Sequence, residues 1–160
     1  EKNEIALLLE NNGNILKISA TTLEITAELQ QTLSKKDAKK YFNSKSGAEG
    51  LIFAKNKVFI STQNDKKNLL EFSINTDKNE LNLEKVYDIP FNDLSGLDYY
   101  NDQLFILSDK NDSIWIYDLE KEEISQTLPL QAGNWEGITH DAQGNIFLAD
   151  DAGQIVQYSK

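Results

Sequence analysis

The stretch Leu94-Ser95-Gly96-Leu97-Asp98-Tyr99 has two close copies elsewhere in this chain. They are Ala48-Glu49-Gly50-Leu51-Ile52-Phe53 and Trp135-Glu136-Gly137-Ile138-Thr139-His140. In each copy an acidic or hydroxyl residue precedes a glycine, and an aliphatic residue follows it. The second glycine lies 46 residues after the first, and the third lies 41 residues after the second. Repeats of this length are typical of the four-stranded blades of β-propellers.

The composition is that of an acidic globular protein. Of its 160 residues 39% are hydrophobic and 26% are charged, and the formal net charge is −10. Such a chain repels phosphate backbones and anionic membrane surfaces, so nucleic acid is not an expected partner. No apolar run approaches the roughly 18 residues that a transmembrane helix needs. The lack of cysteine excludes disulfides, thiolate metal sites and a cysteine nucleophile.

Short apolar runs between turn-forming residues predict antiparallel strands throughout most of the chain. The runs 104–107 and 114–117 are apolar at every position, so both of their faces need cover, and Trp115 is expected in the core. In a propeller each blade lies between its neighbours, which provides that cover. The polar, lysine-rich segment 30–47 differs: Ser34 and Asp37 could cap a short helix there, or the segment is a solvated loop between blades.

The sequence therefore predicts an all-β fold, a β-propeller segment made of four-stranded antiparallel blades. Its units cover about residues 1–30, 48–90, 94–131 and 135–160, and the first and last are incomplete. With the strands of a blade labelled a to d from the inside, the chain supplies b-c-d, then a-b-c-d twice, then a-b-c. Because propellers have about four to eight blades, we expect sequence ahead of Glu1, or a partner chain, to complete the ring.

The three glycine-centred stretches resemble the SdiA-regulated, or YjiK-like, family of bacterial β-propellers. The strand 104–108 and the stretch Gly144-Asn145-Ile146-Phe147-Leu148 are also similar, and the resemblance is to the C-terminal portion of the family. It implies a longer, extracytoplasmic protein without a settled activity, periplasmic or anchored to a membrane through its N-terminus. The Glu-Gly-aliphatic motif is similar to blade starts in lactonase-like and phytase-like propellers too, which implies a metal-dependent hydrolase as an alternative.

Antiparallel pairing predicts which residues share one rim of the central channel. The residue that opens strand a lies at the same end of the blade as the turn between strands b and c. Glu49, Ser95 and Glu136 are therefore expected at this rim beside the channel, with Asp109 and Asp150 in turns further out. The turns expected to join them are 10–13, 63–67, 109–112 and 150–153. Each of these four turns carries at least one carboxylate.

Three interpretations of this rim are open. In the first, the acidic and hydroxyl side chains only accept hydrogen bonds from nearby backbone groups. In the second, Glu49 and Glu136 bind Ca²⁺, with Asn134 or Asp93 as a further ligand, because hard cations prefer several converging oxygens. In the third, such a metal supports hydrolysis. Trp135 either lines a pocket on the rim or packs between blades.

His140 is the only histidine, and its place in a strand a makes it either a base near the channel or a packing residue. No Ser-His-Asp arrangement can be identified from spacing. Without a recognisable nucleophile and base, we expect a non-enzymatic module that binds a small molecule or a protein at the rim. A metal-dependent esterase, lactonase or phosphatase is the alternative, since propellers support both kinds of function.

Overall fold

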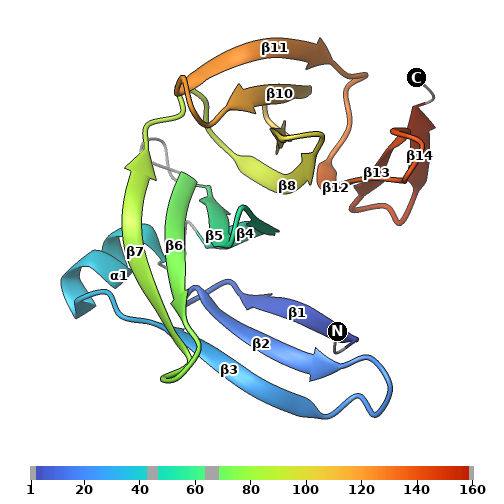
Figure 1. Ribbon diagram of the computed structural model, residues 1–160. Coiled ribbons are helices and arrows are strands. Elements are labelled where there is room, and N and C mark those ends of the chain that lie inside the picture. The colour runs from blue at the N-terminus through green and yellow to red at the C-terminus, as the bar shows by residue number, and fades with distance from the viewer. Residues whose placement is uncertain (1–2, 43–46, 64–68, 159–160) are drawn as a thin grey trace.

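The computed structural model describes residues 3–42, 47–63 and 69–158, which form four sheet units arranged in an arc around a common axis (Figure 1). The first unit contains β1 (Glu4–Leu9), β2 (Asn14–Ser19) and β3 (Ile25–Gln31), and the second β4 (Ala48–Ala54), β5 (Lys57–Thr62), β6 (Leu69–Asn75) and β7 (Glu80–Tyr87). The third contains β8 (Leu94–Tyr100), β9 (Gln103–Ser108), β10 (Ser113–Asp118) and β11 (Glu123–Pro129), and the fourth β12 (Trp135–His140), β13 (Ile146–Asp150) and β14 (Ile155–Tyr158). The predicted all-β propeller segment is confirmed.

Consecutive strands pair antiparallel within each unit, and β4, β8 and β12 are the innermost strands. These three lie against one another in sequence order, while β1 lies against β4. The apolar runs behave as expected: β9 and β10 are buried at almost every position because neighbouring units cover both of their faces. Trp115 lies in β10 and is 2% exposed, in the core between the second and third units.

A β-bulge recurs at the start of each innermost strand. Residues on either side of Glu49 pair with consecutive residues of β5, so Glu49 is an extra residue without a partner in the ladder. Ser95 and Glu136 occupy the same place in β8 and β12. A bulge bends the strand and changes the direction of a side chain. The acidic or hydroxyl residue before each motif glycine is therefore the bulged residue.

A parallel link between the first two units was not predicted. The outer strands β3 and β7 pair over two residues, and Thr32 N–H donates to the carbonyl of Leu81 at 3.0 Å. The first two units thus form one seven-stranded sheet. Outer strands of successive blades run in the same direction, so a contact between them has to be parallel.

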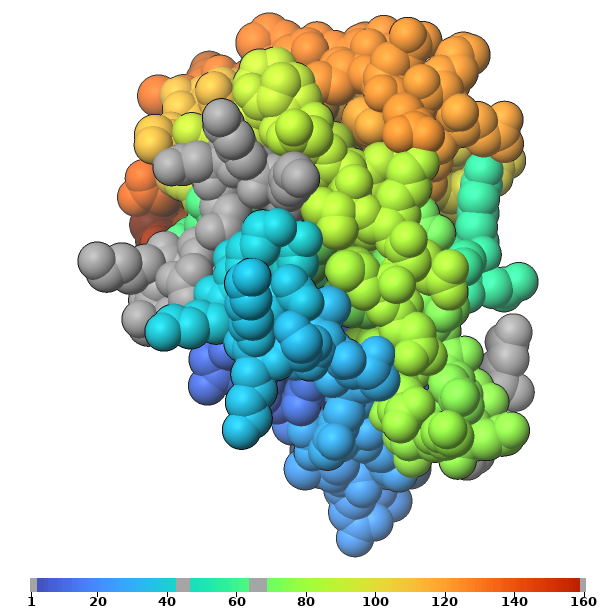
Figure 2. Space-filling model, turned by 90° about the vertical axis from the view of Figure 1, so that its left-hand side faces the viewer, coloured from blue at the N-terminus to red at the C-terminus, as the bar shows by residue number. Residues whose placement is uncertain are grey.

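The helix considered for the segment 30–47 is present as α1 (Lys35–Tyr41), and the alternative of a solvated loop is wrong for these residues. The Ser34 hydroxyl accepts from Asp37 N–H at 3.2 Å, which is an N-cap. Tyr41 and Phe42, at the end of α1, are buried in the core shared by the first two units. Figure 2 shows α1 in cyan beside the outer strands on this side of the molecule.

Candidate functional site

Six carboxylates lie at the rim where the innermost strands begin. Their electrostatic influence on one another marks them as one group, called here the acidic rim: Glu10, Glu49, Asp93, Asp109, Glu136 and Asp151. Two are bulged residues, and the others belong to b–c turns or to the connection before β8. The predicted convergence of b–c turns and strand starts is observed here. The turn at 64–68 lies outside the described residues.

Backbone hydrogen bonds hold this rim together. Ala48 N–H, at the start of β4, donates to the carbonyl of Glu10 in the turn of the preceding unit at 2.9 Å. Trp135 N–H, at the start of β12, likewise donates to the Asp109 carboxylate at 2.8 Å. In both cases the turn of one blade fixes the first residue of the next blade. The bulged carboxylates are thereby held beside the turn carboxylates.

Burial and like charge raise the pKa of three rim residues. The pKa of Glu136 rises to about 7, first because burial disfavours its charged form and then because Asp151 and Asp109 are negative. Glu49 and Asp93 add smaller effects of the same sign. Burial is also the largest cause of the raised pKa values of Glu49 and Asp93 themselves. Among the described residues, the rim therefore concentrates negative charge that nearby cations do not fully compensate.

Two of the predicted site residues have a structural role between the blades. Ser95 is 2% exposed, and its hydroxyl donates to the carbonyl of Trp135 at 2.6 Å, which joins the third unit to the fourth. Trp135 is 6% exposed and packs between these units, while its Nε1–H donates to the carbonyl of Gln131 at 2.9 Å. Of the two interpretations of Trp135, packing between blades fits its position. Ser95 does not present its hydroxyl at the rim, because that hydroxyl is used between blades.

The remaining predicted residues divide between turn and rim. The Asp150 carboxylate accepts from Gln154 N–H at 2.8 Å and closes its own turn. The carbonyl of Asn134 accepts from Asp151 N–H at 3.2 Å, so Asn134 lies next to the rim. Within the described part of the chain, no three acidic or histidine side chains converge closely enough to enclose a metal ion. A cation at this rim would need further ligands.

We expect Glu136→Gln to stabilise the protein at pH 8 and to have little effect at pH 4. The pKa of Glu136 in the folded protein lies above its ordinary value of 4.5, so ionisation opposes folding, and this penalty grows between pH 4.5 and about 7. Because the Glu136 side chain is exposed, solvent screens much of this effect, and we expect a gain of only about 2–4 °C in Tm, roughly 1 kcal/mol for this size.

Thermal melts followed by circular dichroism at both pH values would measure this gain. Glu123→Gln, at an exposed position on β11, is the matched control, and we expect no such gain from it. If Glu136→Gln left the Tm at pH 8 unchanged, or lowered it, the assignment of Glu136 to a repulsive cluster would be wrong.

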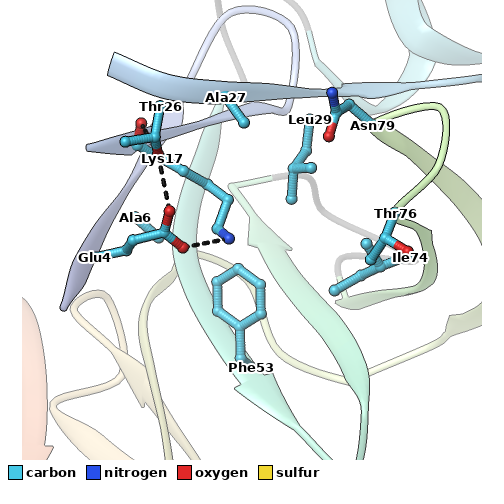
Figure 3. A pocket seen from close by; sticks show the side chains of 10 residues that line it. All are labelled: Glu4, Ala6, Lys17, Thr26, Ala27, Leu29, Phe53, Ile74, Thr76 and Asn79. Atoms are coloured by element: carbon cyan, nitrogen blue, oxygen red, sulfur yellow. Dashed lines mark hydrogen bonds and ion pairs between the residues drawn. The ribbon is translucent and has the colours of Figure 1, made fainter. Parts of the chain in front are cut away.

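Clefts between the blades open on the opposite side, where the innermost strands end. One of them, with a volume of about 640 Å³, lies between the first and second units (Figure 3). Lys17 pairs with Glu4 at 2.5 Å, and Glu4 also accepts from the Thr26 hydroxyl at 2.9 Å. Phe53 faces this ion pair across the cleft. Glu4, Lys17 and Thr26 are thus occupied with one another.

A buried pair of side chains at the ends of the innermost strands was not predicted from the sequence. His140 Nδ1 lies 2.6 Å from the carboxylate of Asp98, which is on the innermost strand of the preceding unit. Tyr100 stacks on the imidazole with ring centroids 4.7 Å apart. His140 is thus at the far end of β12 from Glu136, away from the acidic rim. The available signal was that Asp98 is the fifth residue of one copy of the glycine motif and His140 the sixth residue of the next.

Comparisons with known proteins agree with this architecture. A family model described as SdiA-regulated matches residues 1–153. A sequence search of curated proteins gave no match. The chain belongs to the SdiA-regulated family.

Several solved structures share the fold at low sequence identity. The glutaminyl cyclase of Myxococcus xanthus has a TM-score of 0.70 and 11% identity, over 98% of this chain and 70% of that chain. A luciferin-regenerating enzyme has a TM-score of 0.58 and 16% identity, over 99% of this chain and 55% of that one. A protein of unknown function from Bacteroides caccae has a TM-score of 0.57 and 8% identity, over 99% of this chain and 69% of that chain. These similarities show a shared fold, not a shared activity.

The described residues include no helix with the length and apolar character needed to cross a membrane.

Proposed function

We propose that this protein binds a positively charged group of a small molecule or a protein partner at the acidic rim, without catalysing a reaction. The observation that carries the proposal is the gathering of six carboxylates at one rim: burial first raises the pKa of Glu136, and the negative charges of Asp151, Asp109, Glu49 and Asp93 raise it further, to about 7. Neighbouring carboxylates repel one another, and either a proton or a cation relieves the repulsion. A cationic ligand therefore gains from the same field that opposes ionisation of Glu136.

In its described part, the rim offers oxygen atoms but few other reactive groups. The chain has no cysteine, and its single histidine lies at the other end of β12. The hydroxyl of Ser95 is committed to the carbonyl of Trp135. A nucleophile beside a base, as acyl transfer requires, is not formed by these residues. This supports binding rather than covalent catalysis.

Ca²⁺ is one form that the cation could take. Glu49 and Glu136 would be its protein ligands, with Asn134 and Asp93 beside them, and the remaining oxygens would come from water or from the ligand. An ammonium or guanidinium group of a partner makes fewer geometric demands than Ca²⁺, since one or two carboxylates suffice. We therefore favour an organic cation, and the Ca²⁺ form remains a separate outcome of the test.

The cellular location is proposed from the family resemblance. An extracytoplasmic protein, periplasmic or anchored at the cell surface, would meet cationic peptides and small molecules as well as millimolar divalent cations. Fractionation of cells that express the full-length protein, with an antibody against this region, tests the location. Recovery with the cytoplasmic fraction alone would contradict it.

A short arginine peptide, with its citrulline analogue as the neutral control, provides the sharpest binding test. We expect calorimetry at low salt to detect binding of the arginine peptide only, and we expect added salt to weaken it. Removal of two carboxylates in Glu49→Gln/Glu136→Gln should weaken binding at least about tenfold, or about 1.4 kcal/mol. The control Glu122→Gln/Glu123→Gln changes the same charge away from the rim. Equal losses in both variants would show a non-specific charge effect and contradict the proposal.

Calcium is tested in the same variants by thermal melting. If Ca²⁺ is the ligand, millimolar Ca²⁺ should raise the Tm of the native chain and leave Glu49→Gln/Glu136→Gln unchanged, since a ligand of the folded state alone stabilises it.

A metal-dependent hydrolase of the esterase, lactonase or phytase-like class is the second candidate. The observation that favours it is again Glu136, because a carboxyl group with a pKa of about 7 can transfer protons near neutral pH. A screen of ester, lactone and phosphoester substrates with and without Ca²⁺ separates the two functions. Robust turnover that Glu136→Gln abolishes would refute a role limited to binding.

A further inference from the structure

The imidazole of His140 is fixed from several sides inside the cleft between the third and fourth units. Its side chain is 4% exposed, and that of Asp98 is 13% exposed. Tyr100 stacks on it with an interplanar angle of 4°, and Phe105 contacts it edge-on at 4.3 Å between ring centroids. The ring is thus held in one orientation by two aromatic rings and a carboxylate.

Asp98 determines which nitrogen of the imidazole carries the proton. An ionised carboxylate only accepts hydrogen bonds, so Nδ1, at 2.6 Å from Asp98, must be the donor. A neutral imidazole has a single N–H, which leaves Nε2 with a free lone pair. His140 Nε2 is therefore a hydrogen-bond acceptor in the neutral form.

The Nε2 atom has no hydrogen-bond partner within residues 3–42, 47–63 and 69–158. The imidazole lines a cleft of about 410 Å³, whose aliphatic walls are Ile116, Leu128 and Ile146. Tyr100 and Phe105 add flat surfaces, and Gln103 and Gln126 supply amide groups. A buried acceptor of this kind favours any molecule that brings a donor to it.

We propose that this cleft binds a small, flat, neutral molecule that carries one hydroxyl or N–H group and donates it to His140 Nε2. The aromatic and aliphatic walls match a flat apolar body, and the unpartnered Nε2 of the fixed imidazole matches one donor group. The residues that line the cleft include no lysine or arginine, which argues against an anion. This site is independent of the acidic rim, because it lies at the opposite ends of the innermost strands.

Phenol is a suitable probe because it combines a flat apolar ring with one hydroxyl donor. The chain has one histidine, so the imidazole signals in a ¹H–¹⁵N long-range NMR spectrum need no assignment. Without phenol, and at a pH at which the spectrum shows a neutral imidazole, we expect the pattern of the Nδ1–H tautomer. Added phenol should shift the histidine signals saturably at millimolar concentration. Anisole, which has the same ring but no donor, should bind at least tenfold more weakly.

Two variants distinguish binding of phenol in the cleft from a general effect of adding a tryptophan ring. Leu128→Trp should fill the cleft and abolish the phenol response while the Nδ1–H tautomer persists. Leu23→Trp adds the same ring at a position that is 73% exposed and should leave the response unchanged. Three results would overturn the proposal: an Nε2–H tautomer, equal affinity for phenol and anisole, or no saturable shift in the native chain. None of these depends on whether a substituted variant folds.

Discussion

Gly50→Ala should destabilise the protein by about 3 kcal/mol, the upper end of the range for overpacking a close contact. A Cβ atom at this position would collide with the Ser61 hydroxyl and would lie 2.9 Å from Leu97 Cγ and 3.1 Å from Leu97 N. The nitrogen belongs to the backbone of β8, so it cannot turn aside as a flexible side chain would. The Ser61 hydroxyl is itself engaged, since it donates to the carbonyl of Leu94 at 2.9 Å.

The equivalent substitution in the last unit is a matched control. At Gly137 an added Cβ meets only the Cβ of Ala149, at the ordinary contact distance of 3.5 Å. Gly137→Ala should therefore be neutral, or stabilise the chain by about 0.4–1 kcal/mol by restricting the unfolded state. Urea denaturation of both variants measures the difference. Similar losses at Gly50 and Gly137 would show that backbone conformation, and not the approach of the next blade, requires glycine in the motif.

The repeated motif made the inner ring of strands predictable. The three copies begin at Ala48, Leu94 and Trp135, and these residues begin β4, β8 and β12. Local pattern was sufficient here because turn residues and apolar runs fix strand ends without reference to the rest of the chain. The antiparallel order within a blade then placed strand starts and b–c turns on one rim.

The individual roles within the motif could not be predicted in the same way. Glu49 and Ser95 are equivalent in sequence, and both are bulged residues, yet Ser95 is buried against the carbonyl of Trp135. Whether a bulged side chain faces the rim or the next blade depends on the length of the side chain and on the distance between blades. The spacing of the motif in the sequence predicts neither the distance between blades nor the presence of a bulge.

Contacts between blades could not be predicted from the sequence either. Asp98 and His140 are 42 residues apart, and their contact depends on how far β12 is staggered against β8. The parallel pairing of β3 with β7 depends in a similar way on the tilt of the outer strands. Sequence spacing determines pairing within a hairpin, whereas stagger and tilt follow from the packing of many side chains.

We expect Trp115→Ala to destabilise the protein by about 3–5 kcal/mol, the usual effect of removing a large buried aromatic side chain. Trp115 is 2% exposed, and its ring stacks on that of Phe91 at 3.9 Å between centroids. Total stabilities are about 5–15 kcal/mol, so this loss is a large part of the whole. Trp115→Phe retains an aromatic partner for Phe91 and should lose less, while Leu23→Ala, at an exposed position, should lose little.

The same substitution should also affect the acidic rim. Phe91 lies in the connection between β7 and β8, two residues before Asp93, so its stacking on Trp115 helps to hold that carboxylate in place. Trp115→Phe should therefore keep affinity for the arginine peptide at temperatures where it remains folded. A folded fraction of Trp115→Ala, studied well below its Tm, should bind more weakly because Asp93 is less restrained. If both variants bound the peptide as tightly as the native chain, Asp93 would not be part of the binding surface. The affinity for the peptide would then have to come from Glu49 and Glu136.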